Sequence, residues 1–333
     1  MVRSIPKDKD SLVRIFSKAK DFLQEFYEKN PRANNISYYS RPVHSFENKD
    51  NFPLDFQIFM AIIGESNPFD LLYIELPEEG SQSMDLYDPY WLEPPYDEKV
   101  PIALDKAGNA FYFNTSVRPF MLSDTSHGIE CSFIDWFFDY AFHFSDYGDK
   151  FLAILSEVEA EQTVDKLLNT IEKYNSLYPQ GDERRIDYGP VDISKIRNFA
   201  DYPYDYQYFV SKIGSLRYSP GYAGLSVKCE HMALQDTHPD EFGEYLNCHF
   251  LEIEMNTRYE NEGETIADWA KKEGIAEHIL VAEDPCSYSY LAFDPSASPY
   301  TPIDVIEKQI YPSFVAYVND HLSTPLAEVA ADE

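Results

Sequence analysis

Residues 51–64 read NFPLDFQIFMAIIG, and residues 201–214 read DYPYDYQYFVSKIG. The second stretch follows the first 150 positions later, and the two stretches align without an insertion. The identical pairs are Pro53 and Pro203, Asp55 and Asp205, Gln57 and Gln207, Phe59 and Phe209, Ile63 and Ile213, and Gly64 and Gly214. Phe52 and Phe56 return as the aromatic residues Tyr202 and Tyr206. A repeat of this quality at a long period predicts two copies of one domain.

Each copy of the stretch predicts a short helix. Pro53 suits the first helical position, because its missing N–H has no partner there anyway. Asp55 falls in the first turn, where the helix dipole favours negative charge. Gly64 is the expected stop. Between them one apolar face follows the helical spacing i, i+3, i+4 and i+7, with Phe56, Phe59, Met60 and Ile63 in the first copy and Tyr206, Phe209, Val210 and Ile213 in the second.

The repeat extends along the chain beyond this helix. Three further pairs of segments correspond: amphipathic helices at 11–30 and 156–178, each ended by a proline; pairs of short strands at 100–114 and 279–294; and closing helices at 131–142 and 312–322. The strand pairs align with one residue of slip. In the closing helices Ser132 and Ser313 are the expected N-caps, and Trp136 and Trp269 are expected in the core.

Strands and helices that are segregated along the chain predict an α+β fold. We expect one domain at residues 1–150, with an N-terminal helix, and a second at 151–333, with a leading helix and a frayed acidic tail from residue 322. The boundary should fall near residues 145–156. Whether residues 150–155 continue the closing helix of the first domain or begin the second is open at this point.

The formal net charge of −31 is the dominant compositional feature. Nucleic acid and anionic membrane are not expected as partners, because phosphate binding depends on Lys and Arg clusters. A basic partner is the natural counterpart. The four cysteines form no CxxC pair, the N-terminus MVRSIPKDKD lacks the apolar run of a signal peptide, and no segment has the roughly 20 apolar residues of a membrane span. These features predict a cytoplasmic protein.

The sequence resembles the SUKH superfamily. The resemblance rests on the aromatic-Pro-x-Asp-aromatic-x-x-Phe helix ending in Gly, the closing Ser-Phe helix, and a hairpin that contains Asp105, Gly108, Asn109, Phe111, Tyr112 and Phe113. It covers about residues 30–143 and 180–322, and the second copy departs from the hairpin pattern at Pro285, Cys286 and Ser287. The resemblance implies α+β domains that bind proteins, many of them immunity proteins of bacterial toxin systems and others intracellular regulators or adaptors. It implies no catalytic residues and no cofactor.

Each copy carries an acidic insert between the short helix and the strand pair. Residues 65–100 and residues 229–264 each contain ten Asp or Glu and one basic residue, net −9. Tyr and Trp are interleaved with these carboxylates, and aromatics with carboxylates suit a protein interface. The predicted partner-binding residues are Asp85, Tyr87, Asp88, Tyr90, Trp91, Glu93, Tyr96, Asp97, Asp240, Glu241, Glu244, Tyr245, Glu252 and Glu254.

Two other interpretations of the inserts stay open. A run of charge is often a solvated face that keeps a protein soluble, and Tyr90 and Trp91 can form a local core under their own loop. The combined sequence features favour an immunity protein that occludes a basic toxin without catalysis, and the alternative is an intracellular adaptor. Which copy binds, and the oligomeric state, stay open.

Enzyme chemistry finds little support in the sequence. Among 58 Asp and Glu residues, carboxylate pairs of the glycosidase type arise by chance. The zinc-type residues Cys229, His231, His238, Cys248 and His249 have spacings that match no familiar knuckle. The sequence contains no G-x-S-x-G, G-x-G-x-x-G or P-loop motif. We therefore expect no metal and no cofactor.

Overall fold

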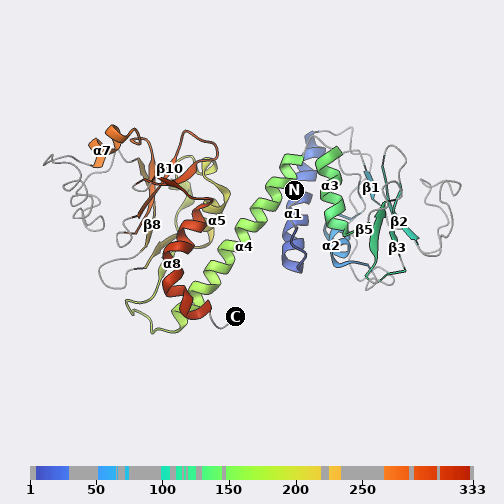
Figure 1. The fold of residues 1–333 in the computed structure, drawn as a ribbon, viewed down its shortest axis with the longest axis horizontal. Helices are drawn as coiled ribbons and strands as arrows, with labels where there is room; N and C mark the ends of the chain where they lie inside the picture. The colour runs from blue at the N-terminus through green and yellow to red at the C-terminus, as the bar shows by residue number, and fades with distance from the viewer. Residues whose placement is uncertain are drawn as a thin grey trace. The chain divides into compact units, whose positions relative to one another are not determined.

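The computed structural model divides the chain into two compact units, Met1–Val158 and Glu159–Glu333 (Figure 1). It describes residues 5–29, 52–64, 66, 72–74, 99–105, 110–114, 116–117, 119–124, 130–144, 148–218, 225–233, 266–284, 289–305 and 308–330. The division lies later than the expected 150/151, because residues 151–158 contribute Phe151, Ile154 and Val158 to the core of the first unit.

The described part of the first unit combines helices with a small sheet, and the start of the next helix also belongs to it. Its elements are α1 (Lys9–Lys29), α2 (Leu54–Ile62), β1 (Leu72–Ile74), β2 (Lys99–Asp105), β3 (Ala110–Asn114), β4 (Met121–Asp124), β5 (Glu130–Cys131) and α3 (Phe133–Phe144). The strands pair in the order β1-β2-β3-β4-β5, and every pairing is antiparallel. In Figure 1 the helices α1, α2 and α3 lie together on one face of this sheet.

The second unit has the same order of elements, with additions. It contains most of α4 (Gly148–Ser176), then β6 (Asp187–Gly189), the 3₁₀ turns η5 (Ile193–Lys195) and η6 (Phe199–Asp201), α5 (Tyr204–Lys212), β7 (Ser215–Arg217), β8 (Ser226–Ala233), α7 (Ile266–Glu273), β9 (Ile279–Asp284), β10 (Ser289–Asp294), β11 (Thr301–Asp304), β12 (Gln309–Ile310) and α8 (Phe314–Ala330). The strands form an antiparallel sheet in the order β12-β11-β10-β9-β8-β7-β6. The expected α+β class is confirmed.

The short helices α2 and α5 share their backbone geometry. The N–H of Gln57 donates to the carbonyl of Pro53 at 3.1 Å, and Gln207 repeats this bond to Pro203 at 3.1 Å. Each helix ends at the predicted glycine, with φ of 82° at Gly64 and 78° at Gly214. A positive φ costs glycine little and other residues more, which explains why both copies end in Gly.

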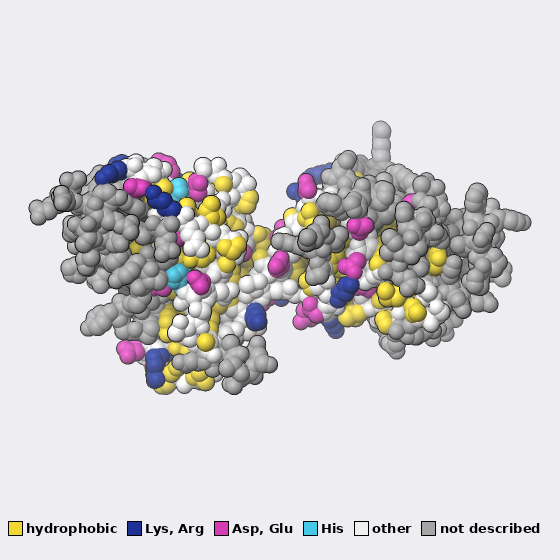
Figure 2. All heavy atoms as spheres, in the orientation of Figure 1, with side chains coloured by type: hydrophobic (Ala, Val, Ile, Leu, Met, Phe, Trp, Pro, Cys, Tyr) yellow, Lys and Arg dark blue, Asp and Glu magenta, His cyan; other side chains and the backbone are white. Residues whose placement is uncertain are grey.

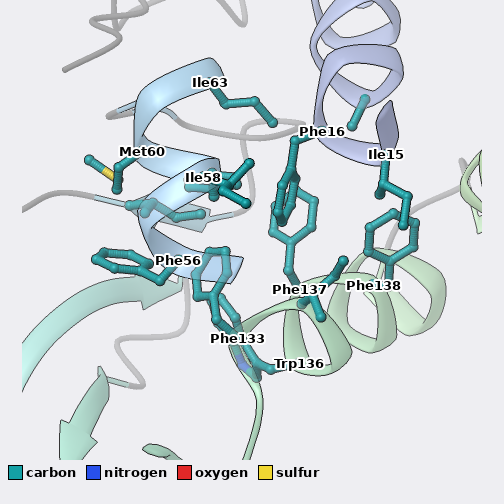
Figure 3. Packing of buried hydrophobic residues seen from close by; sticks show 14 of the residues in the cluster. Ile15, Phe16, Phe56, Ile58, Met60, Ile63, Phe133, Trp136, Phe137 and Phe138 are labelled. Atoms are coloured by element: carbon teal, nitrogen blue, oxygen red, sulfur yellow. The ribbon is translucent and has the colours of Figure 1, made fainter. Parts of the chain in front are cut away.

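The core of the first unit is a cluster of aromatic rings around Phe56 (Figure 3). Phe56 contacts Phe113 of β3 and Phe133 of α3, with ring centroids 4.9 and 5.0 Å apart. Phe52 adds edge contacts with Phe113 and Phe120 at 5.6 and 5.2 Å. Such pairs contribute about 0.5–1.5 kcal/mol each beyond their burial.

The second unit repeats this cluster at the corresponding positions. Tyr206 contacts Phe293 of β10 and Phe314 of α8, with centroids 5.0 and 4.6 Å apart. Tyr202 contacts Phe293 and Tyr300 at 5.2 and 4.9 Å. The two cores therefore use the same set of ring contacts, with tyrosine in the second unit at three positions where the first has phenylalanine.

A buried aspartate joins the short helix to the closing helix in each unit. Asp55 Oδ2 accepts from the N–H of Ile134 at 2.9 Å, and Asp205 Oδ2 accepts from the N–H of Val315 at 3.0 Å. Both N–H groups belong to the first turn of a helix, where backbone donors have no partner within the helix. The first-turn position of these aspartates was predicted, but their carboxylates bind a second helix, which the linear sequence did not indicate.

The closing helices begin as predicted. Ser132 Oγ accepts from the N–H of Asp135 at 3.3 Å, and Ser313 Oγ accepts from the N–H of Ala316 at 3.0 Å, so both serines are N-caps. Trp136 is buried, as expected. The predicted frayed tail is wrong for residues 322–330, because α8 continues to Ala330 and packs Leu322 and Leu326 into the core.

The slip between the two strand pairs lies in the hairpin loop. In the first unit Ala103 pairs with Phe111, and in the second Ala282 pairs with Leu291. The offset between corresponding residues is therefore 179 before the loop and 180 after it. Both pairings also contain an irregularity, at Ile102 and at Val281, where one residue has no partner in the register.

We predict that Asp55→Asn and Asp205→Asn each destabilise the protein by about 1–3 kcal/mol, because asparagine leaves one backbone N–H facing an amide donor. Burial raises the pKa of Asp55 and Asp205, and the backbone N–H bonds from Ile134 and Val315 oppose this shift. Because the pKa of each carboxyl group is higher in the folded than in the unfolded protein, the folded state keeps the proton to a higher pH. The contribution of the carboxyl group to stability is therefore fully present below the unfolded pKa and is lost as pH rises through the folded pKa. The stability lost in each variant should therefore be larger at about pH 4 than at about pH 7. Urea unfolding at both pH values measures the change, and an equal loss at both would contradict the assignment.

Gly214 and Gly181 offer a matched pair of substitutions. A Cβ at Gly214 would lie 1.9 Å from the carbonyl oxygen of Gly189, whereas a Cβ at Gly181 meets nothing within 4 Å, and φ is similar at +78° and +85°. Gly181→Ala should cost about 1–2 kcal/mol, the strain of positive φ alone. Gly214→Ala should cost at least about 1–3 kcal/mol more, because the backbone must shift. Equal losses in thermal unfolding would show that the approach of Gly189 is unimportant.

Candidate functional site

The predicted partner-binding residues lie outside the described residues. This holds for the whole set: Asp85, Tyr87, Asp88, Tyr90, Trp91, Glu93, Tyr96, Asp97, Asp240, Glu241, Glu244, Tyr245, Glu252 and Glu254. Their contacts with one another and with the rest of the chain are therefore not described. The strands on either side of them are described, and they determine where each acidic segment joins its sheet.

Both acidic segments connect corresponding antiparallel strands. Residues 75–98 lie between β1 and β2, where Ile74 pairs with Ala103. Residues 234–265 follow β8, whose last residue, Ala233, pairs with Ile279 at the start of β9. Parts of the predicted inserts belong to the sheets themselves, since residues 72–74 form β1, 99–100 begin β2 and 229–233 end β8.

The register places both connections at the same end of the sheet. Lys99, where the first segment ends, pairs with Asn114 at the end of β3, and Asn114 pairs with Met121 at the start of β4. In the second unit Ile279 pairs with Phe293, one residue before the end of β10. The acidic segment of each unit thus joins the sheet beside the loop that follows the second strand of the hairpin, β3 or β10. This is the end of the sheet opposite the hairpin loop.

A buried polar group in the second unit was not predicted. His321 Nδ1 on α8 lies 2.7 Å from Asp284 Oδ2 at the end of β9, and the two side chains are 7% and 10% exposed. The ring of Tyr317, one turn earlier on α8, lies 4.2 Å from the histidine ring. Asp304 on β11 is 2% exposed. Because a carboxylate only accepts, the Nδ1 atom carries the proton of this hydrogen bond.

The strand register puts both aspartates on the face of the sheet that the helices cover. Asp304 pairs with Leu291, and Leu291 pairs with Ala282, two residues before Asp284. Directly paired residues, and residues two apart on one strand, share a face. The first unit has aspartates at the corresponding positions, Asp105 on β2 and Asp124 on β4. The recurrence of Asp105 as Asp284, and of Asp124 as Asp304, was a sequence signal for these two buried aspartates.

The geometry of the histidine pair suits a structural role. The Nε2 atom of His321 is buried, so solvent does not reach the nitrogen that would act as a base. The hydrogen bond joins α8 to the end of β9. Position 140, which corresponds to His321 when Phe133 is aligned with Phe314, is a tyrosine, so the histidine occurs in the second unit alone.

The zinc-type residues do not assemble into a described site. Cys229 and His231 lie on β8, their side chains outside the described set, and His238, Cys248 and His249 lie outside it altogether. Within the described ranges no group of three or more His, Cys, Asp or Glu side chains is arranged to hold a metal ion. In the same ranges no helix combines the length and apolarity that crossing a bilayer requires.

The chain matches no protein-family model, no curated protein and no solved structure in the comparisons made.

We predict that the Asp284–His321 hydrogen bond couples the two residues energetically. Asp284→Leu and His321→Leu should each cost about 1–3 kcal/mol or more, because each removes one side of a buried hydrogen bond. The double variant should cost clearly less than the sum of the two, since both polar groups are then gone. Urea unfolding of the four proteins of the cycle measures this. Strict additivity would show that the pair does not interact.

Proposed function

We propose that this protein consists of two SUKH-like domains that arose by duplication, and that it acts as a cytoplasmic immunity protein. It binds a basic protein toxin and covers the active or substrate-binding surface of that toxin. It acts by stoichiometric binding and needs no cofactor. The observation that carries the proposal is the attachment of two acidic, aromatic-rich segments at corresponding strand junctions, β1–β2 and β8–β9.

The repeated core supports the part of the proposal that concerns duplication. The helix that ends in glycine, the buried aspartate and the ring contacts around Phe56 and Tyr206 all recur at corresponding positions. These are also the positions on which the resemblance to the SUKH superfamily rests. A duplicated scaffold that holds two binding segments raises the effective concentration of the second once the first is bound.

The distribution of charge supports a basic partner. The acidic segments at 65–100 and 229–264 carry 18 of the 31 excess negative charges. On the face drawn in Figure 2 the acidic and basic side chains of the described residues are interspersed, without a continuous acidic patch among them. The described buried carboxylates Asp55 and Asp205 have structural partners. The segments are therefore the strongest source of electrostatic attraction.

The decisive experiment is growth rescue. A candidate toxin encoded next to this gene is expressed in a bacterial host with and without the protein, and the two proteins are then mixed and separated by gel filtration. Rescue together with a stable complex supports immunity. A stable complex without rescue favours the adaptor alternative, and the absence of both rules out this toxin as the partner.

We predict that neutralising the first segment weakens binding. The variant Asp85→Asn, Asp88→Asn, Glu93→Gln and Asp97→Asn should lose about 1–4 kcal/mol of binding free energy, at about 0.2–1 kcal/mol for each exposed charge. The association rate should fall most at low salt, because charges at an interface steer the encounter. Surface plasmon resonance at two salt concentrations measures both effects.

The matched control removes the same charge elsewhere. Asp21→Asn, Glu28→Gln, Asp149→Asn and Glu183→Gln change four exposed acidic residues of the described surface. The net charge of the two quadruple variants is identical. If the control variant loses as much affinity as the first, general charge and not the segment at 65–100 attracts the partner.

A further inference from the structure

The sheet of the second unit ends at an exposed strand. Among the described strands β6 is the last in the order, and it pairs with β7 on one side. Asp187 and Tyr188 are exposed, Tyr188 to 39%. The outer side of an edge strand carries backbone N–H and C=O groups that can pair with a strand of another chain. The contacts on this side of β6 therefore determine whether the sheet can be extended.

The register shows which residues of β6 point outward. The N–H of Tyr218 donates to the carbonyl of Leu225 at 2.8 Å, in line with the pairing of β7 and β8, so the backbone of Tyr218 faces β8. Along an antiparallel strand the backbone groups of successive residues point to alternate sides. Arg217 therefore faces β6, and its partner Asp187 faces back toward β7. It follows that residues 186, 188 and 190 direct their backbone groups away from β7.

A side chain of the same unit already occupies the first outward position. Asn175, in the last turn of α4, donates from Nδ2 to the carbonyl of Ile186, and its Oδ1 accepts from the N–H of Ile186, both at 2.8 Å. A carboxamide offers the donor and the acceptor of a peptide group, so Asn175 takes the place of a residue in a neighbouring strand. Asn175 is 6% exposed, and burial strengthens both bonds.

The end of α4 is held against this part of the chain. Arg185 Nη1 donates to the carbonyls of Asn175 and Tyr178, at 2.7 and 2.9 Å. The carbonyl of Asn175 is among the last four of the helix, which have no partner within it. Residues 185 and 186 are thus bonded to Asn175 in two ways, and these bonds fix the position of its carboxamide.

The third outward position offers no donor, because Pro190 lacks a backbone N–H. With Ile186 bonded to Asn175, Tyr188 is the one outward residue of this edge whose N–H and C=O can both pair with an incoming strand. Strands in globular proteins usually pair over about three or more residues. A strand that pairs with β6 at a single residue would therefore not be stable.

We propose that Asn175 and Pro190 close the outer edge of β6, and that this closure prevents two copies of the chain from joining their sheets edge to edge. The device lies within the second unit, and it operates whether or not the protein binds a toxin.

A second copy is the partner that this edge would take, because β6 can pair with itself. In an antiparallel pair centred on Tyr188, the two Tyr188 residues exchange both of their backbone hydrogen bonds. Asp187 then lies opposite Gly189 of the second copy, so no like charges face each other. Once Asn175 is replaced, the N–H of Ile186 can donate to the carbonyl of Pro190 of the second copy, and the pairing extends over the whole edge.

The test is the mass of the full chain in solution, measured by analytical ultracentrifugation over a range of concentrations. In Asn175→Leu the mass should rise with concentration toward twice the wild-type value, because the backbone groups of Ile186 are then open. The matched control, Ser176→Leu, adds the same side chain to the same turn of α4 at an exposed position and should keep the wild-type mass.

A second substitution locates the pairing. Tyr188→Pro removes an outward N–H and no bond to β7, and proline is tolerated on edge strands. Asn175→Leu combined with Tyr188→Pro should therefore return to the wild-type mass. The proposal is overturned by a wild-type mass in Asn175→Leu at every concentration, by association that persists in the double variant, or by equal association of Ser176→Leu.

Hydrogen exchange of the wild-type protein tests the closure even if Asn175→Leu does not fold. After correction for intrinsic rates, the amide of Ile186 should exchange at least about tenfold more slowly than the amide of Tyr188, because its bond to Asn175 must open first. Equal rates at the two amides would show that Asn175 does not hold the edge, and would overturn the proposal.

Discussion

One buried carboxylate fixes two helices in each unit. Asp55 and Asp205 sit in the first turn of a short helix and accept from the first turn of the closing helix, so one side chain holds the N-terminal turns of both helices together. The contact brings Phe56 onto Phe133 and Tyr206 onto Phe314, and these rings then pack on the sheet. Burial disfavours the charged carboxylate, and the backbone N–H groups offset part of that cost. Both units nevertheless bury this aspartate, which indicates how strongly the positions of the two helices depend on it.

Local chemistry explains which elements were predictable. Pro53 and Gly64 mark the helix between them because each acts on its own backbone, and the same holds for the serine caps Ser132 and Ser313. The α+β class followed from the order of such local signals. The acidic segments were visible as composition, and their attachment to corresponding strand pairs became clear only from the register.

Features that depend on distant contacts escaped prediction. The partner of Asp55 is 79 residues away, and His321 meets Asp284 across 37 residues. Residues 150–155 were ambiguous because α4 serves two cores, which no single amphipathic pattern describes. Residues 322–330 were predicted to be part of a frayed acidic tail, yet Leu322 and Leu326 continue the buried apolar face of α8 by one further turn each.

The exchange of phenylalanine for tyrosine between the two cores bears on how the chain avoids misfolding. Similar domains in tandem can trade segments while they fold, and such misassembly is a characteristic failure of repeat proteins. If α5 and the residues before it docked in the first unit, Tyr202 and Tyr206 would take the places of Phe52 and Phe56, and two additional oxygen atoms would have to fit between Phe113, Phe120 and Phe133. Overpacking of a well-packed core costs about 1–3 kcal/mol. Two phenol groups thus help each half of the chain to find its own core.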